Sequence, residues 1–350
     1  MHVDDPFIVC RGNDKTVSKE NEEWIHAMLE KRFDTKGRHV LTPEDPIDYL
    51  SMRVSINHDD EVFIDNEEKI KKYLEANGME NCKPAKYPLD KVLLREMESC
   101  DEYMTGDEQT EFRGHIGKFR WLADTTHPMI ACATSILASY CNKPPKNAHK
   151  AVQQVYRFLR YTMNFALTHT QSRGQGLYVE SDADWAGMYS INGDTRSRTG
   201  CALFYDGFLF AWRSAYQNCK ASGYIEDALI ATSTGEAELY AIGEVLKMAL
   251  HTTHYSDEVG VEVPKPIKIG TDSTAAMGFA ANVGKVGRMR HIDVREAWVQ
   301  QMRNKKIAQI EKVPGTENRA DGFTKLLSKI LMVEWINRLG VQFTFGRAEG

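Results

Sequence analysis

The second half of this sequence predicts an α/β fold in which a mixed sheet is flanked by helices. Three segments with strand-like alternation come first, and helical and strand-like segments alternate after them. That order is typical of a sheet whose first strands form hairpins and whose later strands are joined through helices. The first half instead carries several amphipathic segments with helical periodicity, so we expect a mostly helical region before the sheet.

Hydrophobic periodicity, together with glycine and proline positions, gives the expected elements of the first half. Residues 82–107 include Pro84 and Pro88 and predict an extended loop. Helices are expected over 20–33, 68–77, 108–124, 129–140 and 148–161, and strands over 47–56 and 61–64.

A polar, glycine-containing stretch at 168–176 predicts a linker. We therefore expect one domain at 1–167, a second at 177–340 and a tail at 341–350. Asp206-Gly207 lies between two strand-like segments and predicts a hairpin turn. Strands are expected over 177–182, 201–205, 208–212, 267–271 and 308–313, and helices over 234–258, 273–282, 292–303 and 319–339.

Four acidic residues of the second half lie where they suit a metal site. Asp182 ends a strand, Glu238 opens a long helix, Asp272 ends a β-branched run, and Asp321 lies in the first turn of the last amphipathic helix. Strand ends and helix starts can converge on one point, and carboxylates suit hard ions such as Mg²⁺. Taken singly, each residue is more typical of a solvated surface group or a helix cap. The ordered set favours a two-metal site for phosphodiester hydrolysis.

Seven short segments carry a more specific signature. They are Ser181-Asp182-Ala183-Asp184-Trp185-Ala186-Gly187, Ser197-Arg198-Thr199-Gly200, Trp212-Arg213-Ser214, Gly235-Glu236-Ala237-Glu238-Leu239-Tyr240-Ala241, Thr271-Asp272-Ser273, His291-Ile292-Asp293-Val294-Arg295 and Val313-Pro314-Gly315-Thr316-Glu317-Asn318-Arg319-Ala320-Asp321. In this order, the segments resemble the ribonuclease H domain of copia-type LTR retrotransposon Pol polyproteins. The resemblance covers residues from about 176 to 340.

The first half resembles the later part of the reverse transcriptase of the same family. The matching segments are Met1-His2-Val3-Asp4-Asp5, Tyr49-Leu50-Ser51-Met52, Gly78-Met79-Glu80-Asn81-Cys82-Lys83-Pro84, Phe112-Arg113-Gly114-His115-Ile116-Gly117, Trp121-Leu122-Ala123-Asp124-Thr125-Thr126-His127-Pro128 and Arg157-Phe158-Leu159-Arg160-Tyr161-Thr162. The resemblance implies a partial palm and a mostly helical thumb or connection region.

Asp4 and Asp5 lie where the family has its polymerase box. His2 replaces the usual tyrosine and Pro6 follows directly, so the pair also fits a charged turn at a chain terminus. The family's third polymerase carboxylate and its fingers precede this box. We therefore expect no polymerase activity from these residues alone and treat the box as vestigial.

The resemblance implies endonucleolytic hydrolysis of the RNA strand of an RNA–DNA hybrid. Two Mg²⁺ ions, for which Mn²⁺ can substitute, would be held by Asp182, Glu238, Asp272 and Asp321, with Asp182 as the bridging ligand. Two alternatives stay open at this point. One is a catalytically inactive Pol remnant that binds nucleic acid, other Pol segments or a second copy of the chain, and the other is part of a complete RNA-directed DNA polymerase.

A net charge of −5 argues against a uniformly basic surface. Basic residues do gather around Trp298, and they are expected to contact the phosphates of the hybrid, although a solvated helix face is the alternative. The cluster consists of Lys285, Arg288, Arg290, His291 and Arg295, followed by Arg303, Lys305 and Lys306.

Two neighbouring acids receive different interpretations. Glu236 precedes Glu238 by two positions on the expected helix, so it should point elsewhere and be solvated. Asp184 can share the strand face of Asp182, but the resemblance implies that Asp182 is the ligand.

The seven cysteines show no paired spacing, and neither a signal peptide nor a membrane span is evident. We therefore expect an intracellular protein, cytoplasmic or nuclear, that is not secreted and has no membrane partner.

Overall fold

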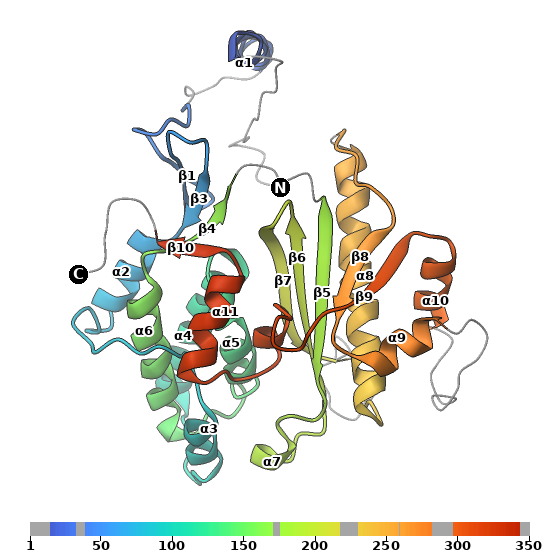
Figure 1. Ribbon diagram of the computed structural model, residues 1–350. Coiled ribbons are helices and arrows are strands. Elements are labelled where there is room, and N and C mark those ends of the chain that lie inside the picture. The colour runs from blue at the N-terminus through green and yellow to red at the C-terminus, as the bar shows by residue number, and fades with distance from the viewer. Residues whose placement is uncertain are drawn as a thin grey trace.

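The computed structural model describes residues 15–32, 39–170, 176–217, 230–258, 260–281 and 297–343. Two five-stranded sheets organise this part of the chain (Figure 1). The first has the strand order β1-β2-β3-β4-β10 and the second the order β7-β6-β5-β8-β9. The predicted α/β class, with a mixed sheet flanked by helices and a helix-rich region before it, is confirmed.

Most of the first region is helical, as expected. Its elements are α1 (Lys15–Glu30), β1 (Ile47–Tyr49), β2 (Met52–Ile56), β3 (Val62–Asp65), α2 (Glu67–Glu75), α3 (Lys91–Glu98), α4 (Gly106–Thr125), α5 (Ala131–Ala138), α6 (His149–Thr162) and β4 (Phe165–His169). The helix α3 lies inside the segment 82–107, where an extended loop was expected, so that expectation was wrong there. Asp90 caps this helix by accepting a 2.8 Å hydrogen bond from the Leu93 amide, and Leu94 and Met97 are buried.

The second sheet contains both antiparallel and parallel pairs. Its elements are β5 (Leu177–Asp184), α7 (Tyr189–Asn192), β6 (Arg198–Tyr205), β7 (Phe208–Tyr216), α8 (Thr234–Glu258), β8 (Ile267–Thr271), α9 (Thr274–Ala281), α10 (Ala297–Asn304) and β9 (Ala308–Lys312). The central strand β5 is antiparallel to β6 and parallel to β8. Asp206 and Gly207, with φ of 50° and 89°, form the predicted hairpin turn between β6 and β7.

The second sheet is buried on both faces. Val179, Leu203 and Ile269 belong to a core shared with α8, α9 and α10. On the other face, Ala202 and Phe204 join the larger core formed by the helices of the first region. The sheet therefore lies between two helical layers (Figure 1). Among the described residues, no helix combines the length and apolar character needed to cross a bilayer.

The C-terminal segment differs from the single helix expected over 319–339. It forms a 3₁₀ turn, η4 (Asp321–Phe323), then α11 (Lys329–Arg338) and β10 (Val341–Phe343). The chain bends between them because Trp335 of α11 folds back over Gly322 and donates a 2.7 Å hydrogen bond to the Arg319 carbonyl.

β10 pairs antiparallel with β4, with Val341 opposite Leu167. Residues 341–343 are therefore a strand of the first sheet and not the start of a tail, and residues 168–169 of the expected linker belong to β4. The division of the chain into the two expected domains stays a prediction.

Candidate active site

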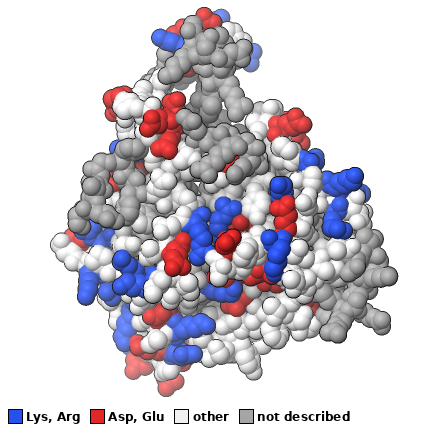
Figure 2. Space-filling view, viewed as in Figure 1, with Lys and Arg blue, Asp and Glu red and all other residues white. Residues whose placement is uncertain are grey.

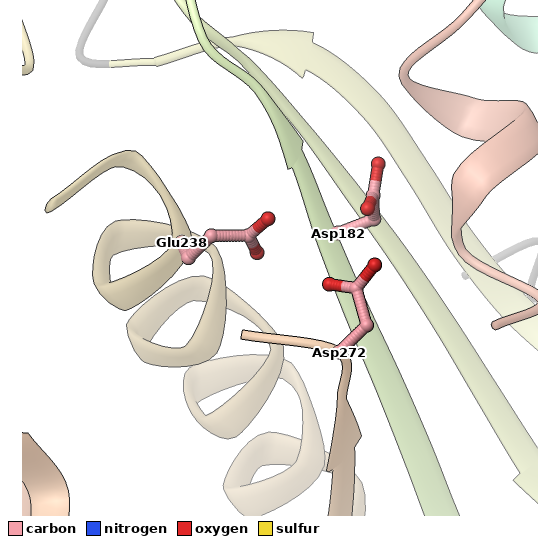
Figure 3. A group of neighbouring side chains, drawn as sticks. All are labelled: Asp182, Glu238 and Asp272. Atoms are coloured by element: carbon pink, nitrogen blue, oxygen red, sulfur yellow. The ribbon is translucent and has the colours of Figure 1, made fainter. Parts of the chain in front are cut away.

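Three of the four predicted carboxylates converge at one edge of the second sheet (Figure 3). Asp182, Glu238 and Asp272 each offer an oxygen atom, and these atoms all lie within 4.8 Å of one another. Asp182 lies near the end of β5, and Asp272 directly follows β8. Because β5 and β8 are parallel, their carboxyl ends meet at the same edge of the sheet. We call these three residues the acid cluster.

Glu238 reaches the acid cluster because small residues let the start of α8 approach β5. Ala183, Ala237 and Ala241 form a small buried contact between the strand and the helix. The Glu238 carboxylate forms a hydrogen bond with the backbone of Ala183. Its Oε2 atom is buried without a hydrogen-bond partner among the described residues. A buried carboxylate oxygen that lacks a donor is costly, so this atom fits a bound cation.

The electrostatics of the acid cluster also fit a cation. Burial, reinforced by Asp182 and Asp272, raises the pKa of Glu238 to about 9. Burial raises the pKa of Asp182 to about 6. The nearby Lys325 lowers this pKa, whereas Asp321 and Asp272 raise it further. Without a metal ion at neutral pH, the cluster therefore holds a proton that a divalent cation would release.

Asp321 lies on the other side of Asp182 and is not part of the acid cluster. Its carboxylate forms an ion pair with Lys325, whose ammonium group is also 3.5 Å from Asp182 Oδ2. Burial lowers the pKa of Lys325, but Asp182 and Asp321 outweigh that effect and raise it. Thr324 donates a hydrogen bond to the same Asp182 oxygen. Sequence analysis missed Lys325, although its position four residues after Asp321 was a usable signal.

An ion pair between the buried Glu180 and the half-buried Arg319 holds the Asp321 segment against β5. Glu180 is 3% exposed, and its Oε1 accepts hydrogen bonds from Arg319 Nη2 at 2.8 Å and Nε at 3.0 Å. The Arg319 amide donates to Glu180 Oε2 at 2.6 Å, and its guanidinium lies 3.5 Å from the centroid of the Phe204 ring. Asn318 adds a 2.9 Å hydrogen bond to the Ser181 carbonyl. Glu180 and Arg319 therefore fix where Asp321 lies, which no local pattern indicated.

The expectation that Glu236 is solvated was wrong. This residue is 3% exposed, and its carboxylate accepts hydrogen bonds from the Thr232 amide at 2.7 Å, the Thr232 hydroxyl at 2.8 Å and the Tyr240 hydroxyl at 2.6 Å. Its donors come from the segment before α8 and from Tyr240 one turn further along the helix, and a negative charge also suits the positive end of the helix dipole. Glu236 thus stabilises the helix start that carries Glu238.

Asp184 is not part of the acid cluster and lies beside Gly187. A Cβ atom placed on Gly187 would lie 1.7 Å from Asp184 Oδ2, so the carboxylate occupies the space that a side chain at position 187 would fill. Burial raises the pKa of Asp184, and the surrounding Lys325, Lys91 and Arg198 oppose the rise. Asp184 therefore belongs to a second polar region beside the acid cluster.

The sequence of the chain is similar to those of Pol polyproteins from plant transposons. No protein-family model matches the chain. The chain is 28% identical over 333 residues to the retrovirus-related Pol polyprotein from transposon TNT 1-94 of Nicotiana tabacum, a match that covers 94% of this chain and 23% of that protein. It is 25% identical over 234 residues to the Pol polyprotein from transposon RE1 of Arabidopsis thaliana, which covers 67% of this chain and 15% of that protein.

The chain is a relative of retrovirus-related Pol polyproteins. It spans less than a quarter of the length of these two Pol relatives. Among solved structures, it is similar to LC11-RNase H1 in complex with RNA/DNA hybrid, with 16% identity, a TM-score of 0.31, and 42% of this chain and 92% of that chain covered. It is also similar to the foamy viral protease-reverse transcriptase in complex with double-stranded DNA, with 10% identity, a TM-score of 0.49, and 86% and 44% covered.

Several of the residues predicted to be functional lie outside the described part of the chain. The predicted phosphate contacts Lys285, Arg288, Arg290, His291 and Arg295 fall there, as do Asp4 and Asp5 of the polymerase box. Arg303 lies in the last turn of α10, and the exposed Lys305 and Lys306 follow this helix. Basic and acidic side chains are interspersed over the face shown in Figure 2.

Proposed function

We propose that this chain hydrolyses the RNA strand of RNA–DNA hybrids. The observation that carries the proposal is the convergence of Asp182, Glu238 and Asp272 at the carboxyl edge of parallel strands, with a buried Glu238 oxygen that lacks a donor. Such a cluster suits divalent ions, and phosphodiester hydrolysis is the chemistry that paired divalent ions support. The resemblance of residues 176–340 to the ribonuclease H domain of copia-type Pol polyproteins favours an RNA–DNA hybrid as the substrate.

Each acidic residue has a position that fits a role in holding metal ions. Asp182 lies between Glu238 and Asp272 on one side and the Asp321–Lys325 pair on the other, so it would contribute to both metal positions. Mg²⁺ bound there would supply positive charge to the attacking water and to the departing 3′ oxygen. Thr324 orients Asp182 through its hydrogen bond, and the Glu180–Arg319 pair keeps Asp321 within reach.

The test is cleavage of an end-labelled RNA–DNA hybrid, with the same RNA alone and a DNA duplex as comparison substrates. We expect internal cuts in the RNA of the hybrid with Mg²⁺ or Mn²⁺, and none in chelator, because the attacking and departing oxygens both need positive charge and the divalent ions would supply it. Cleavage that persists in chelator would contradict the metal assignment. A folded chain that binds hybrid but never cleaves it would support the alternative of an inactive Pol remnant.

A further inference from the structure

A small cavity lies beside the acid cluster and is not explained by the proposed hydrolysis. Its volume is about 20 Å³, and its polar lining comes from Lys91, Asp184, Arg196, Arg198, Tyr216 and Thr324. Thr324 lines this cavity and also donates a hydrogen bond to Asp182. The cavity is therefore separated from the acid cluster by a single residue. We call it the Arg198 cavity.

Arg198 is a buried cation that is only partly satisfied. The residue is 3% exposed, and its Nη1 donates a 2.7 Å hydrogen bond to Ser135 Oγ. The guanidinium carbon lies 4.2 Å from the Tyr216 ring centroid, yet Nη2 is buried without a hydrogen-bond partner among the described residues. A buried charged donor without an acceptor is costly. Nη2 is therefore available to donate a hydrogen bond to a group that enters the cavity.

The charges around the cavity favour an anion as that acceptor. Arg196 is paired with Asp194 at 2.6 Å, so its charge is largely balanced. Lys91 is exposed at the first position of α3, and none of the ion pairs found in the described ranges includes it. Asp184 is the carboxylate of the cavity wall and faces both Lys91 and Arg198. Lys91 and Arg198 against the single carboxylate of Asp184 leave a local positive charge among the described residues of the cavity wall.

We propose that the Arg198 cavity receives one non-bridging oxygen of a backbone phosphate of the bound nucleic acid, held by Arg198 Nη2 and Lys91. A cavity of about 20 Å³ admits one water-sized group, which matches a single phosphate oxygen and not a whole phosphate. The choice of a nucleic acid as the ligand rests on the proposed function. The phosphate that reaches the Arg198 cavity is a different one from the phosphate that is cleaved. An ordered water in the cavity is the competing occupant.

This proposal gives the first region a part in substrate binding. Lys91 belongs to α3, which packs beside α7 at the end of β5 (Figure 1). Ser135, which orients Arg198, belongs to α5 of the same region. The second sheet alone would therefore carry an incomplete cavity, and contacts with phosphate would depend on helices that lie outside it.

The experiment measures binding of a short fluorescent RNA–DNA hybrid by anisotropy, in chelator and over a range of salt concentrations. We expect Lys91→Gln to weaken binding about two- to fivefold and to reduce the slope of log affinity against log salt by about 1. Lys91→Arg should bind like the unmodified chain. Lys72→Gln, an exposed lysine of α2, is the matched control and should have no effect.

A second arm locates the phosphate. A neutral methylphosphonate replaces one backbone phosphate of the hybrid at a time, along each strand. At one position, this replacement should lower the affinity of the unmodified chain to that of Lys91→Gln. The affinity of Lys91→Gln itself should not fall further at that position. Arg198→Lys, checked for folding by thermal melting, should lose its sensitivity at the same position.

Equal effects of Lys91→Gln and Lys72→Gln would overturn the proposal, as would a hybrid that does not bind at the lowest salt concentration. The proposal would also be overturned if no methylphosphonate position removed the difference in affinity between the unmodified chain and Lys91→Gln. The occupant of the cavity would then be water. Because these measurements contain no metal, they are independent of cleavage. A chain that shows the expected pattern but never cleaves keeps the cavity assignment and loses the proposed hydrolysis.

Discussion

The ammonium nitrogen of Lys325 lies 3.5 Å from Asp182 Oδ2 while it also contacts the Asp321 carboxylate. Asp182 and Asp321 are the two carboxylates that would share a metal position on this side of the acid cluster. Without metal, Lys325 neutralises part of their mutual repulsion, and its side chain is 41% exposed, so it has room to move outward. A divalent ion at that position would have to displace the ammonium group.

Replacing Lys325 with methionine should therefore tighten metal binding. Removal of a competing cation is expected to increase Mn²⁺ affinity about fivefold, equivalent to about 1 kcal/mol, as measured by isothermal titration calorimetry. In chelator, the same variant should melt at a lower temperature because the two carboxylates then repel each other. Lys329→Met removes an exposed lysine nearby and is the control. Equal Mn²⁺ affinity in all three proteins would show that Lys325 does not compete.

Neutralising Asp182 should nearly abolish hybrid cleavage. Asp182→Asn removes charge from both expected metal positions, and a loss of roughly 3–4 kcal/mol in transition-state stabilisation slows the reaction about 10²- to 10³-fold. Glu236→Gln is the comparison, because Glu236 caps α8 and does not face the cluster. It should lower the melting temperature yet keep most of the cleavage rate per folded molecule. An active Asp182→Asn would mean that the site has been placed on the wrong residue.

The raised pKa of Glu238 predicts how the stability of the metal-free protein depends on pH. Its ordinary value is 4.5 and its value in the folded chain is about 9. The folded state therefore favours the protonated form, and this contribution to stability is complete below pH 4.5 and is lost as the pH rises through 9. In chelator, the melting temperature of Glu238→Gln relative to the unmodified chain should rise from pH 5 to pH 9. A constant difference across this range would contradict the assignment.

Much of the second sheet could be predicted because its signals are local. The helix expected over 234–258 and the strand expected over 267–271 have the observed bounds, since each depends on its own periodicity and its flanking residues. The first strand of the sheet, expected to end at Asp182, extends two residues further. The predicted strand ends and helix start also place Asp182, Glu238 and Asp272 where they can meet, so their convergence could be expected from the sequence.

The contacts that complete the site depend on segments far apart in the chain and left no local signal. Glu180 and Arg319 are 139 positions apart, and the pairing of β10 with β4 joins residue 341 to residue 167. Glu236 shows the same limit, because its burial depends on how the segment before α8 folds over it. Sequence periodicity reports which face of a helix is apolar and does not report which acidic residue finds donors inside.

The Glu180–Arg319 pair should be strongly coupled. Arg319→Met removes the guanidinium from the buried Glu180 carboxylate and leaves only the backbone amide of residue 319 as its donor, which is expected to lower the free energy of unfolding by about 3 kcal/mol. Glu180→Gln combined with Arg319→Met should recover much of that loss, because no buried charge is then left unpaired. Urea denaturation of the two single variants and the double variant measures the coupling. Additive effects would show that the pair does not act as a unit.

Gly187 should be intolerant of even a methyl group because of Asp184. A Cβ at this position would lie 1.7 Å from Asp184 Oδ2 and 2.3 Å from its carboxyl carbon. The carboxylate would have to leave its place in the wall of the Arg198 cavity, so Gly187→Ala is expected to lower the free energy of unfolding by about 1–3 kcal/mol. Gly278→Ala is the control, since no described atom lies within 4 Å of its Cβ position on α9 and alanine favours a helix.

The decisive measurement repeats the Gly187 substitution in an Asp184→Ala background. With the carboxylate gone, the added methyl group has space, and the Gly187→Ala change should then cost little in urea denaturation. The difference between the two backgrounds isolates the clash from any general effect of the substitution on the loop after β5. If Gly187→Ala costs the same in both backgrounds, Asp184 does not occupy the position described, and the wall of the Arg198 cavity would have to be redrawn.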